Sequence, residues 1–330
     1  MIDIVATGPL NTIQDLGRPG YRNIGVTACG AMDPLALLIG NILVGNAPEA
    51  AGIEVQTFPF SVRFAARSAF AVTGADCRAT LDGINLPPWW AAQAKAGQVL
   101  ELSPPLKEAR AYLSLAGGMD VAPVMGSRST SLRGGFGGLN GRVLATGDKV
   151  ATGAAAGACL PKGGFGVVPP AVALKDAFPV GEGGSFMIRA LPAGEHDLFG
   201  ADVERFWSQP WKISARSDRT GYRLSGDPIH PVETVEMRSH GVVPGVVQVP
   251  PAGEPIVQMS DANTAGGYPK IAGVIEADLW RLGQARIGSM LRFVPATHAE
   301  AKAIEGALAA YIEDVRQTAR LVSQALSAMA

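Results

Sequence analysis

Glycine and proline interrupt this chain at short intervals, and this spacing limits the secondary structure that it can form. The 330 residues include 41 glycines and 24 prolines, which recur roughly every 8 to 12 residues. The segments between them are rich in β-branched and aromatic residues, for example residues 60–64 (FSVRF) and 111–115 (AYLSL). Short strands separated by turn signals are typical of sheets and barrels. We therefore predict a mainly β protein with some helix, of the α+β class.

Three segments depart from this pattern and carry helix signals. Asp33 followed by Pro34 supplies an N-cap and a proline at the first helical position, which predicts a helix over residues 33–44. A shorter helix is predicted over residues 201–208. Thr297 and Glu300 form a capping box, which predicts a long C-terminal helix.

The length of the chain favours two β-rich lobes rather than one domain. We place them at residues 1–178 and 179–330, with the long helix at the end of the second. Of all residues, 47% are hydrophobic and 17% are charged, which suffices for a large core and indicates that a partner covers part of the surface. Trp89 and Trp90 are candidates for such a covered edge, or else for the core.

Charge and cysteine usage exclude several classes of partner. The net charge is −1 without a basic block, so no nucleic-acid ligand is expected. Cys29, Cys77 and Cys159 are widely spaced, which favours reduced thiols in the cytoplasm. The N-terminus does not resemble a signal peptide. The apolar segment at 34–48 has 15 residues, too few to span a bilayer, so a cytoplasmic protein without a membrane partner is expected.

The common catalytic motifs are absent from the sequence. It contains no GxxxxGK[ST] loop for nucleotide phosphates, no HExxH helix and no GxSxG nucleophile turn. The four histidines are scattered, so no metal site is predicted. His240 is the histidine with the strongest claim to a role at a site, although a surface or core histidine is the more common case.

Residues 261–270 (DANTAGGYPK) gather the most chemistry in the shortest span. They follow two predicted strands around a Pro/Gly turn, so the cluster lies where a strand ends. Two adjacent glycines predict backbone with positive φ and close approach of a ligand. An ordinary polar turn is the alternative. The candidate catalytic residues are Asp261, Tyr268 and Lys270, and the candidate binding residues here are Gln248, Asn263, Thr264, Gly266 and Gly267.

Two further groups of residues are candidates for binding an anion. Arg219 and Arg223 flank Tyr222, and on a strand both guanidinium groups share one face, where they would converge on one anion. Surface arginines paired with local acids are the alternative. Arg128 lies in a serine-rich segment, residues 126–130 (GSRST), which suits a nest for a carboxylate or phosphate but also an ordinary turn.

Four groups of motifs, in order along the chain, resemble the family of allophanate hydrolase subunit 2, or biotin-dependent carboxyltransferase subdomain, proteins. The motifs are residues 12–21 (TIQDLGRPGY) with 30–35 (GAMDPL) and 43–46 (LVGN); 117–120 (GGMD) with 126–130 and 134–138 (GGFGG); 218–224 (DRTGYRL); and 248–270 with 278–284 (DLWRLGQ). The resemblance covers nearly the whole chain. This sequence departs from the family in having Ala262-Asn263 in place of Arg-Gln, and His240 where an acid is frequent.

The resemblance implies a cyclophilin-like β-barrel and a role as one subunit of an enzyme. The pattern is most similar to the C subunit of the bacterial ATP-dependent 5-oxoprolinase, which hydrolyses the lactam of 5-oxoproline to glutamate. Such a subunit is expected to act only with subunits A and B, of which the second is the most direct partner. ATP is then expected mainly on, or shared with, a partner subunit. The chain has no Met-Lys-Met signature, so it is not expected to carry biotin.

The resemblance also implies roles for the candidate residues and leaves two other functions open. Arg219, Arg223 and Lys270 would bind a carboxylate or stabilise charge that develops on the lactam oxygen. Asp261 would orient water or the ring N–H. One alternative is the carboxyltransferase subunit of a biotin-dependent urea or amide carboxylase. The other is a regulatory antagonist that binds a kinase-inhibitor protein.

Overall fold

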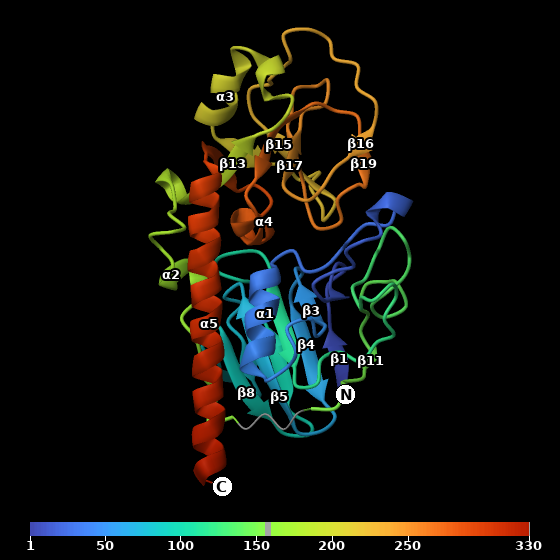
Figure 1. The fold of residues 1–330 in the computed structure, drawn as a ribbon. Helices are drawn as coiled ribbons and strands as arrows, with labels where there is room; N and C mark the ends of the chain where they lie inside the picture. The colour runs from blue at the N-terminus through green and yellow to red at the C-terminus, as the bar shows by residue number, and fades with distance from the viewer. Residues whose placement is uncertain (156–159, 330) are drawn as a thin grey trace. The chain divides into compact units, whose positions relative to one another are not determined.

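The computed structural model describes residues 1–155 and 160–329, and its contacts divide the chain into two compact units. The first comprises Met1–Arg18, Cys29–Ala173 and Ala309–Ala330, and the second comprises Pro19–Ala28 and Leu174–Leu308. Helix α5 (His298–Met329), red in Figure 1, contributes residues to both. Compact units are not the same as independently folding domains, so the boundary between lobes 1–178 and 179–330 stays a prediction.

Two six-stranded sheets, counted over the described residues, form the first unit. Their strand orders are β11-β1-β4-β9-β6-β7 and β12-β8-β5-β10-β3-β2. The strands are β1 (Ile2–Ala6), β2 (Thr12–Gln14), β3 (Gly52–Val55), β4 (Phe60–Phe64), β5 (Ser68–Gly74), β6 (Thr80–Leu81), β7 (Ile84–Asn85), β8 (Trp90–Ala94), β9 (Val99–Leu102), β10 (Ala111–Leu115), β11 (Lys149–Val150) and β12 (Phe165–Gly166).

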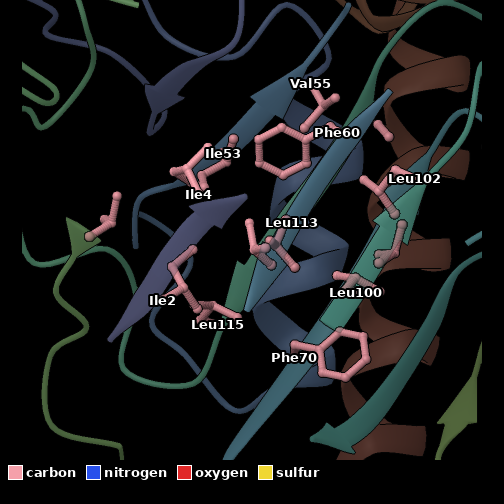
Figure 2. Close-up of a cluster of buried hydrophobic side chains, with 14 of the residues drawn as sticks. Ile2, Ile4, Ile53, Val55, Phe60, Phe70, Leu100, Leu102, Leu113 and Leu115 are labelled. Atoms are coloured by element: carbon pink, nitrogen blue, oxygen red, sulfur yellow. The ribbon is translucent and has the colours of Figure 1, made fainter. Parts of the chain in front are cut away.

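Apolar side chains from both sheets meet in one core. Figure 2 shows Ile4 and Phe60 of the first sheet beside Ile53 and Leu113 of the second. Strand side chains alternate between faces, so the intervening residues of β3 and β10 point the other way. There the Tyr112 hydroxyl donates a 2.8 Å hydrogen bond to the Glu54 carboxylate and accepts one of 2.7 Å from the Asp33 backbone N–H. This polar pair anchors the start of helix α1 (Pro34–Leu43) on the outer face of the second sheet.

Local capping sets the helix starts that the sequence predicts. The Asp33 side chain accepts a 2.9 Å hydrogen bond from the Ala36 N–H, which confirms the predicted helix. Thr297 and Glu300 exchange backbone-to-side-chain bonds of 2.7 and 3.2 Å, so the capping box is also confirmed. Helix α3 (Asp202–Ser208) agrees with the predicted shorter helix. Helices α2 (Pro170–Ala173) and α4 (Leu279–Gln284) were not predicted, because such short helices show too little periodicity.

A closed barrel forms the centre of the second unit, with the strand order β13-β20-β17-β18-β15-β14-β21. Strands β21 and β13 close it by parallel pairing. Beside it lies a two-stranded sheet of β16 and β19. The strands are β13 (Phe186–Pro192), β14 (Trp211–Ile213), β15 (Gly221–Ser225), β16 (His240–Gly241), β17 (Val246–Gln248), β18 (Ile256–Gln258), β19 (Ala265–Gly266), β20 (Lys270–Val274) and β21 (Met290–Pro295). The predicted β-rich α+β class with a barrel and a long C-terminal helix is confirmed; the cyclophilin-like relationship stays a prediction.

Tryptophan and cysteine side chains in the first unit are mostly internal. Trp89 is buried and its ring N–H donates a 2.9 Å hydrogen bond to the Gly74 carbonyl, so it belongs to the core rather than to an exposed edge. Cys29 and Cys77 are buried thiols outside any disulfide, and burial raises the pKa of Cys77 to about 12. Cys159 lies outside the described residues. None of the helices in the described ranges is long and apolar enough to cross a membrane.

Candidate functional site

The loop at residues 261–270 is anchored at its start by an ion pair. The Arg219 guanidinium binds both carboxylate oxygens of Asp261, at 3.0 and 3.1 Å, and the Asp261 N–H donates to the Arg219 carbonyl at 2.9 Å. Both side chains are largely buried, with 7% and 14% of their surfaces exposed. A bidentate pair of this kind fixes position as well as charge. Asp261 therefore holds the loop in place.

The middle of the loop is held by the β16–β19 sheet and by an arginine from a distant segment. His240 pairs with Gly266 across this sheet, and the Val242 N–H donates to the Thr264 carbonyl. Arg22, in the short 3-10 helix η1 (Arg22–Ile24), donates from Nη2 to the carbonyls of Val242 and Asn263. The loop and β16 are thus joined by a side chain more than 200 residues away in sequence.

The end of the loop is held by a pair of glutamines in the barrel. Gln248 donates a 3.2 Å hydrogen bond to the Tyr268 carbonyl and accepts one of 3.1 Å from Gln258. A register shift beside Gln248, where it pairs with Lys270, marks a β-bulge. Bulges redirect side chains near functional sites. Here the Gln248 amide lies against Gly266.

The prediction of positive φ at Gly266 and Gly267 is wrong, because neither residue has a left-handed backbone. Both positions lack room for a side chain. A Cβ at Gly266 would lie 2.7 Å from the Gln248 amide nitrogen, and one at Gly267 would lie 3.1 Å from the Met237 carbonyl oxygen. The close-approach part of the argument holds, but the approaching groups belong to the protein itself.

We expect Gly266→Ala to reduce activity by roughly tenfold while lowering the free energy of unfolding by only about 1–2 kcal/mol. The new methyl group displaces the Gln248 amide and breaks its bond to the Tyr268 carbonyl. Gly273→Ala on β20 is the matched control, because no heavy atom lies within 4 Å of a Cβ there. Rates of the assembled enzyme and thermal unfolding of both variants test this. Equal activity in the two variants would contradict it.

Lys270 and Tyr268, the other two candidate catalytic residues, have contrasting surroundings. The Lys270 ammonium lies 3.2 Å from the Glu195 carboxylate, whose same oxygen accepts from the Lys270 backbone N–H at 3.0 Å. Both side chains are mostly buried. Tyr268 is 46% exposed. Lys270 is thus held in place by a paired charge, whereas the Tyr268 ring is open to solvent.

The structure does not bring Arg219 and Arg223 together. Strand β15 begins at Gly221, so Arg219 precedes the alternating strand register on which the expectation depended. Arg219 turns inward to Asp261, whereas Arg223 is exposed. Tyr222 between them is 1% exposed and its hydroxyl faces the Ala285 carbonyl at 3.4 Å. Tyr222 is therefore a residue of the barrel core.

The serine-rich segment around Arg128 does form a nest for a carboxylate, and that carboxylate is Asp15 of the same chain. Asp15 accepts 2.6 Å hydrogen bonds from the hydroxyls of Ser127 and Ser129, and one of 2.5 Å from the Arg128 N–H. The Arg128 side chain donates to the Val121 carbonyl. The expected chemistry is present, but it stabilises the first unit instead of recruiting a ligand.

Three buried polar atoms around the loop have no hydrogen-bond partner: Nε2 of His240, Oε1 of Gln258 and Nη1 of Arg22. The His240 Nδ1 lies 2.9 Å from the Arg238 carbonyl, which can only accept, so Nδ1 carries a proton. In the neutral ring Nε2 is then an acceptor. Unsatisfied buried polar groups are rare, and at a site they are contact points for a ligand. The cluster suits a small molecule with both N–H and anionic groups.

Sequence reasoning missed Arg22, Gln258 and Glu195. Arg22 directly follows the motif at residues 12–21, so its position was a signal. Gln258 ends a strand paired with that of Gln248, which two predicted strands around a turn already implied. Glu195 gave no signal, because its pairing with Lys270 depends on barrel closure.

The described residues contain no group of three or more His, Cys, Asp or Glu side chains placed to hold a metal ion. The loop itself offers one carboxylate, Asp261, which is already paired with Arg219. The residues at this site thus do not fit the magnesium ion that accompanies ATP, which binds carboxylates and substrate phosphates. We therefore assign no step that involves ATP to this loop.

Comparison with known proteins places this fold in a family. Residues 24–295 match the carboxyltransferase domain, subdomain A and B. The chain is 42% identical to the C subunit of 5-oxoprolinase from Escherichia coli, over 91% of this chain and 93% of that one. It is 39% identical to the C subunit of 5-oxoprolinase from Haemophilus influenzae, over 96% and 98% of the two chains. The crystal structure of the K. lactis urea amidolyase superposes with a TM-score of 0.84 and 27% identity, over 95% of this chain and 20% of that one.

The match covers most of the chain, and it includes the barrel, the β16–β19 sheet and the whole loop at residues 261–270. The chain belongs to the family of the carboxyltransferase domain, subdomain A and B.

Proposed function

We propose that this chain is the C subunit of an ATP-dependent 5-oxoprolinase complex, which hydrolyses the lactam of 5-oxoproline to glutamate. The observation that carries the proposal is its identity of 42% and 39% to two proteins of that name, over nearly the full length of both partners in each comparison. Substrate contacts are assigned to the loop at residues 261–270 and its supports. The cytoplasm is the proposed location.

The polar groups of the loop suit recognition of a lactam. A lactam presents one N–H donor and one carbonyl acceptor. The unpartnered acceptors of His240 and Gln258 would receive the N–H. The Lys270 ammonium, kept in position by Glu195, would stabilise negative charge on the lactam oxygen. Asp261 would act as a positioning residue through Arg219. Tyr268, Asn263 and Thr264 complete the proposed binding loop.

ATP is assigned to the complex and mainly to a partner subunit. This chain lacks a glycine-rich phosphate loop with a following lysine. Subunits A and B are the proposed partners, the second of them the most direct, and biotin is not carried here. The chemistry that ATP supplies is activation of an amide carbonyl, which is otherwise a poor electrophile.

Reconstitution tests this proposal. The purified chain is expected to show no 5-oxoproline-dependent ATP hydrolysis, and addition of subunits A and B is expected to produce both phosphate and glutamate. Coupled assays of the two products should give equal rates. Turnover by the isolated chain, or a complete complex without 5-oxoproline-dependent turnover, would overturn it.

A carboxyltransferase subunit of a urea or amide carboxylase is the second candidate. It is favoured by the family to which the chain belongs and by the fold of the K. lactis urea amidolyase. That reaction requires bicarbonate and a biotin carrier. ATP hydrolysis by the reconstituted complex that depends on urea and bicarbonate, and is blocked by avidin, would favour this candidate over a lactam hydrolase.

A further inference from the structure

Arg22 lies at the candidate site although it is far from it in sequence. It belongs to Pro19–Ala28, a short segment whose contacts place it in the second unit while its flanking residues belong to the first. Its Nη2 binds the carbonyls of Val242 and Asn263, where β16 and the loop come together. Arg22 is therefore fixed against the loop by neutral backbone groups.

The charge of Arg22 differs from that of other arginines in the same unit. Arg219 pairs with Asp261 at 3.0 Å, and Arg189 pairs with Asp278 at 2.6 Å. Among the described residues Arg22 forms no such ion pair, and its Nη1 is buried without a hydrogen-bond partner. Burial lowers the pKa of Arg22. A cation removed from water without a counter-ion is unfavourable, and an anionic ligand offsets that loss.

Resting on the proposed function, we propose that Arg22 binds the carboxylate of the substrate and makes the site specific for lactams that carry an acid. A guanidinium group matches a carboxylate in shape and charge. In 5-oxoproline the carboxylate and the ring N–H are attached to the same carbon. Arg22 binds at Val242, two residues from His240 and thus about 7 Å along the strand. Two hydrogen bonds of about 2.9 Å and a molecule of this size span such a distance.

The test compares two substrates in the reconstituted complex: 5-oxoproline and its carboxamide, which has the same shape without the charge. Wild-type enzyme is expected to prefer the acid in kcat/KM. Arg22→Met is expected to reduce kcat/KM for the acid by roughly 10- to 100-fold, the effect of one charge-assisted contact, and to leave the carboxamide nearly unchanged. Arg22→Lys, which keeps the charge and can still bind both carbonyls, should retain part of the preference.

Arg216→Met is the matched control, because Arg216 forms an exposed ion pair with Glu254 in the same unit. It should leave both substrates unaffected. If Arg22 only braces the loop, Arg22→Met will lower kcat/KM for both substrates by the same factor, and the proposal fails while the proposed function stands.

A binding measurement separates failure of this inference from failure of the proposed function. Thermal unfolding of the complex is followed with 5-oxoproline, with glutamate and with the carboxamide. If the wild-type complex has no 5-oxoprolinase activity, the proposed function fails, yet stabilisation by the acids that disappears in Arg22→Met still supports a carboxylate site. The absence of any difference between wild type and Arg22→Met would overturn the assignment of Arg22.

Discussion

Asp15→Ala is expected to lower the free energy of unfolding of the first unit by about 3–5 kcal/mol, because it removes an acceptor shared by several buried donors. The carboxylate binds the hydroxyls of Ser127 and Ser129, and its remaining bonds go to the N–H groups of Arg128 and Gly17. Asp15 is 6% exposed, so water cannot replace it. A melting temperature lower by roughly 10 °C, measured by calorimetry, is the expected result.

Asp3→Ala is the control for this effect. Asp3 also belongs to the first unit, but its ion pair with Lys149 is at the surface, so its loss should change stability by less than about 1 kcal/mol. If Asp15→Ala unfolds at the temperature of Asp3→Ala, the serine-rich nest is not a stability element and its role as a ligand site would be reopened.

Asp261→Asn is expected to destabilise the second unit by about 3 kcal/mol and to abolish most activity of the assembled enzyme. The change leaves the largely buried Arg219 guanidinium without its counter-charge and releases the start of the loop. Both effects have one cause, so loss of activity should follow loss of loop anchoring. Urea unfolding and steady-state rates of the complex measure them.

A double-mutant cycle distinguishes this anchoring role from direct catalysis. Arg219→Gln should be as damaging as Asp261→Asn, and the double variant should be no worse than either, because an uncharged pair leaves no unpaired buried charge. A double variant with restored stability but no activity would identify Asp261 as a catalytic residue. Wild-type stability in Asp261→Asn would contradict the anchoring role.

Local signals in the sequence were sufficient for the elements whose ends are set by nearby residues. The helix that begins after Asp33 and the capping box at Thr297 and Glu300 involve contacts over three residues, and both are present as predicted. The α+β class followed in the same way from the spacing of turns. The short helix α4 escaped prediction, because six residues do not establish a period.

The residue types at the candidate site were predictable, but their partners were not. A serine-rich nest for a carboxylate was expected at Arg128, yet only the fold could reveal that Asp15, 113 residues away, fills it. Likewise the residues at 261–270 were identified from the sequence, while their positive φ was wrongly inferred. The glycines are required by the Gln248 side chain and by the Met237 carbonyl, which the folded barrel brings close.

The sequence by itself determined the class of the fold, the main helix starts and the loop that concentrates the polar chemistry, because these depend on spacing and on groups adjacent in the chain. The tertiary structure alone decided which charges are neutralised and which are held by neutral groups. Arg219 is paired with Asp261 and Lys270 with Glu195, whereas Arg22 binds backbone carbonyls. Such pairings form across tens to hundreds of residues, where the closing of strands rather than local propensity sets the distance between two atoms.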